Sequence, residues 1–180
     1  MKSVQRGFAL IELLLALAIT GILGTGAAVT ISQLFQNNTR NNDYLSAVSK
    51  IETAGNYISQ DIQSAEEIQA TGLSGSNFVI LYWNERSTVE GTITVSHVIT
   101  YYFSGVSNHV GKLMRNHWSS SGTDTDTRIT DHIYINASDP DNSSQVTYND
   151  PALTVRLKSV VGNESEVREY TIERRVNSIY

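Results

Sequence analysis

The residues from Phe8 to Ile31 form an apolar stretch of about 24 residues, enough helix to cross a bilayer. Its only charge is Glu12. A carboxylate inside a membrane span costs roughly 2.5–3.5 kcal/mol on insertion scales, so we expect Glu12 to meet a specific partner. Residues 1–7 carry Lys2 and Arg6 and no acid. Basic residues before a span predict a cytoplasmic N-terminus and an extracytoplasmic C-terminal domain on a single-pass protein.

Three interpretations compete for this segment. A secretory signal peptide would have an apolar region of about 7–15 residues and a small-residue cleavage site. The run here is longer, and residues 27–29 are the nearest approach to such a site. A plain signal anchor explains the length and the flanking charge but leaves Glu12 unexplained. The third interpretation is cleavage between Gly7 and Phe8, which makes Phe8 the first residue of the mature chain and Glu12 the fifth.

A short basic leader ending in Gly7, followed by Phe8, Glu12 and an unbroken apolar helix, resembles the type IV prepilin signal. The resemblance implies that a membrane aspartyl peptidase, prepilin peptidase, cuts after Gly7 and methylates the new amine of Phe8. It also implies that Glu12 pairs with the N-terminal amine of a neighbouring subunit. Two charges that are each costly in hydrocarbon become tolerable together when adjacent helices lie in register. Pilins that build the bulk of a fibre usually have proline where this chain has Val29.

The composition limits the other functions of the chain. Acidic side chains outnumber basic ones, 18 to 13, and the basic ones form no run. Nucleic acid is therefore not predicted as a ligand, because neutralising phosphates requires clustered Lys and Arg. The chain has no cysteine, which excludes a disulfide framework and a thiolate metal site. Many pilins carry a disulfide in their C-terminal region, but this chain cannot form one because it has no cysteine.

Apolar residues recur at spacings of three and four after the span, which predicts an amphipathic continuation of the helix over residues 32–72. Thr71 and Gly72 provide the expected stop. Residues 36–42 are mostly poor helix formers, so we expect a bend or a frayed turn there. The predicted apolar stripe consists of Leu45, Val48, Ile51, Gly55, Ile58, Ile62 and Ala65.

Residues 73–180 change to the two-residue period of β-strands. Predicted strands cover residues 78–83, 93–103, 112–118, 128–136, 152–160 and 167–176, and predicted loops cover 119–126 and 138–149. The inward row of the second strand would be Ile93, Val95, His97, Ile99, Tyr101 and Phe103, and that of the fifth Leu153, Val155 and Leu157. Short strands without intervening helices indicate an antiparallel sheet, which is the only partner for the apolar helix stripe. The predicted fold is therefore α+β, a long N-terminal helix packed on an antiparallel β-sheet.

A looser resemblance concerns the subtype. Residues 57–65, the strand 99–103 and the segment 113–115 look like parts of minor pilins of the PilW type and minor pseudopilins of the J type. In those families the segments form a helix before the sheet and two strands joined by a variable turn. The simpler interpretation is structural, with Asp61 as an exposed helix residue and Arg115 as a charge at a strand edge.

No enzyme motif is recognisable. The histidines, His97, His109, His117 and His132, have no metal-ligand spacing, and the chain has neither a nucleophile elbow nor a phosphate loop. His97 lies in an apolar strand row and is expected to be a satisfied core residue. Two oxygen-rich clusters, at residues 124–126 and 139–142, hold side chains of the kind that calcium uses, but Asp, Asn and Pro are ordinary turn formers. We therefore predict no catalysis, no metal and no cofactor.

Two functions remain. The first is a structural assembly subunit, a minor pilin or pseudopilin of a type IV pilus or type II secretion-like filament, acting at initiation or at the tip. Its partners would be other pilin or pseudopilin subunits, prepilin peptidase and an inner-membrane assembly platform. The alternative is a membrane-anchored or fibre-tip binding module, similar to an adhesin, whose Tyr82, Trp83 and Trp118 would contact a surface ligand. The domain division is the same in both: residues 1–7 are a cleaved leader, 8–31 span the membrane, 32–72 continue the helix and 73–180 form the outer sheet domain.

Overall fold

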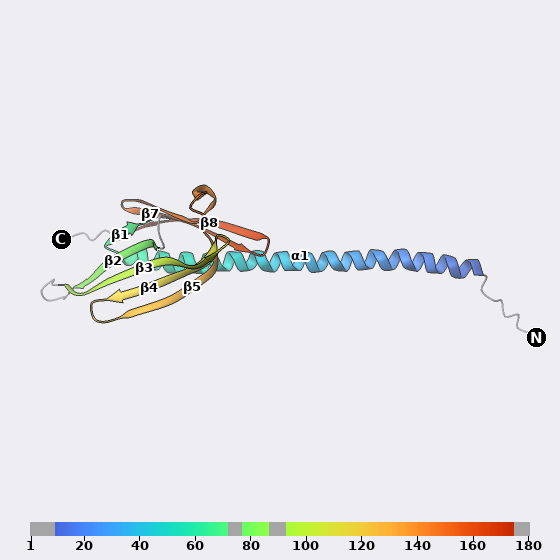
Figure 1. Ribbon diagram of the computed structural model, residues 1–180, viewed down its shortest axis with the longest axis horizontal. Coiled ribbons are helices and arrows are strands. Elements are labelled where there is room, and N and C mark those ends of the chain that lie inside the picture. Colours follow the sequence, from blue (N-terminus) through green and yellow to red (C-terminus); the bar gives the residue numbers. More distant parts are fainter. Residues whose placement is uncertain (1–9, 72–76, 87–92, 175–180) are drawn as a thin grey trace, which may run out of the picture. The chain divides into compact units, whose positions relative to one another are not determined.

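A computed structural model describes residues 10–71, 77–86 and 93–174. It divides into two units, residues 1–42 and 43–180, which we treat separately. The first unit contains the N-terminal part of α1, and the second contains the rest of α1 and the strands (Figure 1). One long helix packed through its C-terminal part on an antiparallel sheet confirms the predicted α+β fold.

Helix α1 runs from Leu10 to Ser64, 55 residues. It is helical across residues 36–42, so the structure shows no break at the asparagine-rich run. Helix nucleation is costly and propagation is not, and this run is flanked by stable helix on both sides. The predicted continuation of the helix to Gly72 is wrong. The helix ends at Ser64 because residues 67–70 pair with the sheet, where Ile68 is buried opposite Leu81.

The described strands form one antiparallel sheet. Their order is β1-β2-β3-β4-β5-β7-β6. Strand β8 lies off this path and pairs with β7. A single residue pair, Ile133 with Ser159, joins β5 to β7. The elements are β1 (Glu67–Ala70), β2 (Asn77–Arg86), β3 (Ile93–Ser107), β4 (Val110–Ser119), β5 (Asp124–Tyr134), the 3-10 helix η1 (Pro140–Asn142), β6 (Gln145–Asn149), β7 (Ala152–Val161) and β8 (Glu164–Glu173).

All six predicted strands are confirmed as strands, with shifted ends. Two further strands, β1 and β6, lie where helix and loop were predicted. Strand β5 begins at Asp124, inside the predicted loop 119–126. These segments are short or polar, so their own sequence gives little two-residue alternation. Their strand conformation comes from pairing with β2, β7 and β4.

The core lies between the C-terminal part of α1 and the sheet. The buried face of α1 comprises Ala47, Ile51, Ala54, Gly55, Ile58 and Ile62. The predicted stripe is thus correct from Ile51 onward, whereas Leu45 is 63% exposed. Facing α1 are Ile99, Tyr101 and Phe103 from β3 and Leu153, Val155 and Leu157 from β7, as predicted. Ile93, the first residue predicted for the inward row of β3, is instead exposed. Burial of each large apolar side chain contributes about 1.5–3 kcal/mol.

One glycine allows β8 to approach the helix closely. A Cβ atom on Gly55 would lie 2.3 Å from Cζ of Tyr170. The Tyr170 hydroxyl donates a hydrogen bond to the backbone carbonyl of Ile51 at 3.3 Å. The aromatic ring therefore packs directly on the helix backbone, which only glycine permits at this position.

Candidate assembly site

The sequence predicted three functional residues at the N-terminal end: Gly7 and Phe8 at the cleavage site, with Phe8 methylated, and Glu12 for subunit assembly. Gly7 and Phe8 lie outside the described residues, so their roles stay predictions. Glu12 lies in the first turn of α1 with an exposed side chain. A carboxylate in this turn gains about 0.3–1 kcal/mol from the helix dipole. That offsets only part of the roughly 2.5–3.5 kcal/mol that a carboxylate costs in hydrocarbon.

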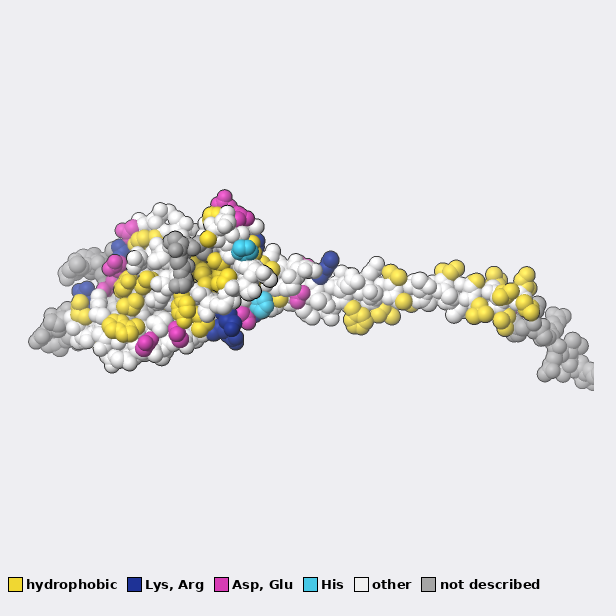
Figure 2. Space-filling model, viewed as in Figure 1, with side chains coloured by type: hydrophobic (Ala, Val, Ile, Leu, Met, Phe, Trp, Pro, Cys, Tyr) yellow, Lys and Arg dark blue, Asp and Glu magenta, His cyan; other side chains and the backbone are white. Residues whose placement is uncertain are grey.

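The N-terminal part of α1 exposes apolar side chains on all sides. It contains a window of mean hydropathy 2.0, none of which is buried inside the protein. Leu10, Ile22 and Phe35 are 78%, 73% and 69% exposed. In Figure 2 hydrophobic side chains gather along this part of the helix. By length and composition α1 can cross a membrane, and lipid or other apolar helices would cover such a surface.

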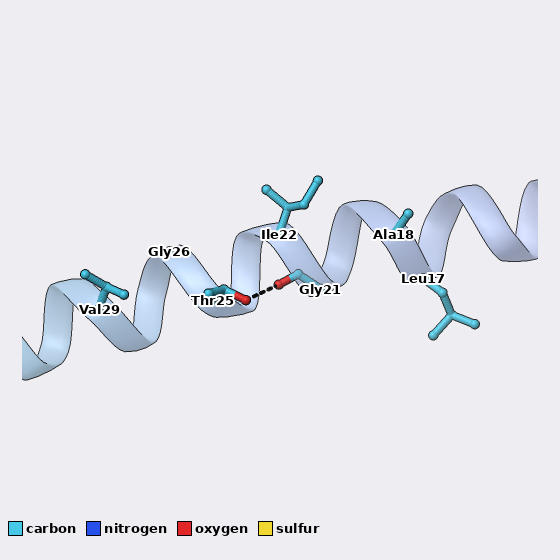
Figure 3. A pocket seen from close by; sticks show the side chains of 7 residues that line it. All are labelled: Leu17, Ala18, Gly21, Ile22, Thr25, Gly26 and Val29. Atoms are coloured by element: carbon cyan, nitrogen blue, oxygen red, sulfur yellow. Dashed lines mark hydrogen bonds between the residues drawn. The ribbon is translucent and has the colours of Figure 1, made fainter.

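One side of this exposed helix has a shallow groove, because Ala18, Gly21, Thr25 and Gly26 are small residues. The groove is open and measures about 620 Å³ (Figure 3). Apart from the adjacent backbone of the helix itself, no heavy atom of the described residues lies within 4 Å of a Cβ built on Gly21 or Gly26. The Thr25 hydroxyl donates to the Gly21 carbonyl at 2.8 Å, so its polar group is satisfied within the helix. Grooves of this kind let neighbouring helices approach closely in a membrane. The lining residues are Leu17, Ala18, Gly21, Ile22, Thr25, Gly26 and Val29.

A second hollow surrounds Glu12. It measures about 500 Å³ and is otherwise lined by Ile11, Leu14, Leu15 and Ala18. Among the described residues that line this apolar depression, Glu12 is the one with a charged side chain. Such a depression suits a partner that is itself apolar and carries a single positive charge.

In the second unit, polar contacts fix the sheet to the helix. The Asp61 carboxylate accepts two hydrogen bonds from Arg115, Nε to Oδ2 at 2.7 Å and Nη2 to Oδ1 at 3.1 Å. The Tyr101 hydroxyl donates to the same carboxylate. Burial raises the pKa of Tyr101, and the negative charge of Asp61 raises it further. The interpretation of Asp61 as an exposed helix residue and Arg115 as a strand-edge charge is wrong, because their side chains are only 16% and 20% exposed.

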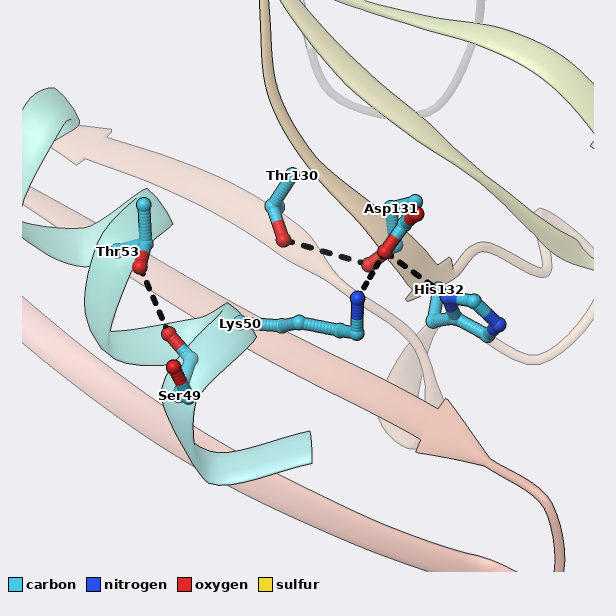
Figure 4. A network of polar contacts seen from close by, with 6 residues as sticks. All are labelled: Ser49, Lys50, Thr53, Thr130, Asp131 and His132. Atoms are coloured by element: carbon cyan, nitrogen blue, oxygen red, sulfur yellow. Dashed lines mark hydrogen bonds and ion pairs between the residues drawn. The ribbon is translucent and has the colours of Figure 1, made fainter. Parts of the chain in front are cut away.

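A second set of polar contacts, which we call the Lys50–Asp131 clamp, joins α1 to β5. Lys50 extends from the helix to Asp131, whose Oδ1 also lies 2.9 Å from Nδ1 of His132 (Figure 4). The Lys50 hydrogen bond, followed by that of His132, lowers the pKa of Asp131 to about 2. This clamp could not be predicted from the sequence, since an isolated Lys on a helix and an Asp in a strand carry no signal of pairing.

Two of the histidines, His97 and His117, lie next to each other on neighbouring strands. His97 Nδ1 lies 3.1 Å from His117 Nε2, and the Trp83 ring stacks on His97 with centroids 4.8 Å apart. Burial lowers the pKa of His117, and the charge of Arg115 lowers it further. His97 is largely buried, as expected, but its Nε2 makes no hydrogen bond of good geometry, although Glu85 Oε1 lies 3.2 Å away. Among the described residues no three His, Cys, Asp or Glu side chains converge as metal ligands.

The two oxygen-rich clusters are engaged in contacts of their own. In the second cluster, the carbonyl oxygens of Asp141 and Asn142 accept hydrogen bonds from Arg156 and Lys158. Cationic side chains thus lie against two backbone oxygens of this cluster. In the first cluster, Asp124 Oδ1 accepts from Asn116 Nδ2 at 2.9 Å.

Residues 2–28 match the family model of the prokaryotic N-terminal methylation motif. Comparison with curated proteins and with solved structures gave no match. The motif implies processing by prepilin peptidase and assembly with pilin subunits, and it points to a structural subunit rather than an enzyme. Together with the exposed apolar helix it fits a membrane-anchored, pilin-like protein. The match supports a type IV pilin-like prepilin signal in the N-terminal segment of this chain.

Proposed function

We propose that this protein is a minor pilin or minor pseudopilin, a structural subunit of a type IV pilus or a type II secretion-like filament. One observation carries the proposal. The methylation motif over residues 2–28 coincides with an exposed apolar helix whose first turn holds a single carboxylate, Glu12.

Processing comes first in this proposal. Prepilin peptidase hydrolyses the peptide bond between Gly7 and Phe8 and releases residues 1–7 as a leader. The new α-amine of Phe8 is then methylated. A methylated amine still binds a proton, so the mature helix begins with one positive charge. Glu12, the fifth residue of the mature chain, supplies one negative charge.

Assembly then pairs these charges between subunits. The Phe8 end of one subunit is apolar and carries one cation, which matches the apolar hollow around Glu12 of another. Each charge offsets the cost of the other in hydrocarbon only when the helices lie in register. The groove around Gly21 and Gly26 gives a neighbouring helix room to pack.

The second unit would supply contacts outside the membrane. We assign residues 8–31 to the span, the following part of α1 to a connecting helix, and the sheet domain to the extracytoplasmic side. Lateral contacts of that domain would place the subunit at filament initiation or at the tip. An inner-membrane assembly platform would receive the processed subunit, and the chain itself would perform no chemistry. The partly buried pair of Asp61 and Arg115 supports the minor-pilin subtype, because both residues lie in the segments that carry that resemblance.

Replacing Glu12 tests the proposal. Glu12→Ala should insert in the membrane at the wild-type level but be lost from sheared filaments, measured by immunoblotting membrane and filament fractions. Glu169→Ala, which removes an exposed carboxylate from β8, is the matched control and should assemble normally. Wild-type amounts of Glu12→Ala in filaments would overturn the proposal.

A further inference from the structure

A polar hollow lies on the face of the sheet that points away from α1. It is open to solvent and measures about 370 Å³. It draws side chains from four neighbouring strands, β2 to β5. Every lining side chain carries a hydrogen-bonding group, and none is aliphatic. The lining residues are Asn77, Thr100, Tyr102, Asn116 and Asp126.

Strand register brings these side chains together. Asn116 of β4 lies directly opposite Thr100 of β3 on one side and Asp126 of β5 on the other. Residues directly opposite in an antiparallel sheet share a face. Tyr101 is buried against the helix, so its neighbours Thr100 and Tyr102 point to the outer face.

Hydrogen bonds within the hollow orient its polar groups. Desolvation raises the pKa of Tyr102 and the neighbouring Asp126 carboxylate raises it further, so the phenol stays protonated. The Asn116 amide donates to Asp124 at 2.9 Å. A carboxylate has about four lone-pair sites and an amide carbonyl two. Asp126 and Asn116 therefore retain acceptor capacity for the hydroxyl groups of a ligand.

An exposed indole adjoins the hollow. Trp118 lies two residues beyond Asn116 on β4, hence on the same face about 7 Å further along at 3.3 Å per residue. Its side chain is 43% exposed. Trp83, which the adhesin-like alternative also named, instead packs against the core. Tyr82 lies in the same row as Trp118, since both residues pair with Val98.

We propose that this surface binds a neutral saccharide. A sugar has hydroxyl groups for the amide and carboxylate acceptors, and a ring face of C–H groups that can lie on the Trp118 indole. Anionic ligands are disfavoured by the carboxylates of Asp124 and Asp126. Wholly apolar ligands would leave the polar lining desolvated without partners. The proposal goes beyond filament assembly and involves none of the N-terminal residues, Gly7, Phe8 and Glu12, to which processing and charge pairing were assigned.

The test uses the full chain in lipid nanodiscs, which avoids glycoside detergents that could occupy the hollow. The probes are an array of neutral oligosaccharides of glucose, galactose, mannose and N-acetylhexosamines, followed by calorimetric titration of the tightest one. The wild-type chain should bind, and binding should not change between low and high salt. Trp118→Ala and Asn116→Ala should each weaken binding by about tenfold or more, as expected for anchor residues.

Tyr57→Ala is the matched control, because Tyr57 is an aromatic residue of similar exposure, 45%, on α1. It should bind as the wild type does. Thermal melting should show that all variants are folded, since each altered side chain is at least partly exposed. Three results would overturn the proposal: no neutral glycan binds, binding survives both hollow variants, or binding disappears at high salt. The last result would show that charges, which a neutral saccharide lacks, govern the binding.

Discussion

Arg115 on β4 and Asp61 on α1 form a two-point ion pair that ties the helix to the sheet, with N–O distances of 2.7 and 3.1 Å. Tyr101 completes the arrangement by donating to the same carboxylate. Bidentate pairs of this kind restrict orientation as well as distance. The pair therefore fixes the rotation of this part of α1 on the strands that pack against it.

Removing one partner of this pair should destabilise the sheet domain strongly. Asp61→Ala leaves Arg115 partly buried without its counter-charge, and we expect a loss of about 2–4 kcal/mol in the free energy of unfolding. Arg115→Ala should cost a similar amount. Urea denaturation followed by tryptophan fluorescence would measure both. In the double variant the losses should not add, because the two residues act as one unit.

The exposed pair Glu52–Arg168 provides the control for this measurement. Its side chains are 52% and 38% exposed, although the N–O distance is also 2.7 Å. Glu52→Ala should therefore cost less than about 1 kcal/mol. Equal losses for Glu52→Ala and Asp61→Ala would show that burial of the Asp61 pair is unimportant.

Gly55→Ala should destabilise the domain although alanine favours helix. The new methyl group would meet the Tyr170 ring at 2.3 Å, and overpacking costs about 1–3 kcal/mol. The gain in helix propensity, about 1 kcal/mol, offsets only part of that cost. Thermal unfolding should show a lowered midpoint for Gly55→Ala. In a Tyr170→Ala background the same substitution should become neutral or stabilising, and a persistent loss there would refute the steric explanation.

Acid should weaken the Lys50–Asp131 clamp. The pKa of Asp131 is lowered from 3.8 to about 2 in the folded protein, so its contribution is complete above pH 4 and is lost as the pH falls toward 2. The Asp131 side chain is 32% exposed, so we expect a contribution of less than about 1 kcal/mol. Denaturation across this pH range should reveal it. Lys50→Met should be less stable at neutral pH and show a smaller loss on acidification, whereas an unchanged pH profile would exclude the clamp as its source.

The mature chain should begin at Phe8. Intact-mass and peptide mass spectrometry of protein from its native host should find the residues from Phe8 onward with one added methyl group. Deletion of prepilin peptidase should restore residues 1–7 and leave the amine of Phe8 in a peptide bond. Mature protein that retains its leader in an assembly-competent host would contradict this assignment.

Much of this protein could be predicted from sequence because the relevant signals are local. One short segment holds the basic leader, the apolar run that begins at Phe8 and its single carboxylate, Glu12. The methylation motif at residues 2–28 lies in the same segment and is likewise a local signal. The strand alternation of β3 and β7 likewise depends on neighbouring residues, because side chains alternate between the faces of a strand. Periodicity thus predicted the α+β fold and most of the inward residues.

Tertiary structure decided what depends on residues distant in the chain. The helix ends at Ser64 because the backbone after it gains more by pairing with β2 than by adding a helical turn. Asp61 and Arg115 are 54 residues apart in sequence, and Gly55 meets Tyr170 from the last strand. Neither contact has a local signature. Ion pairs, close approaches and the outer-face hollow arise only when the sheet brings separate strands into register, and a residue's immediate neighbours do not encode that register.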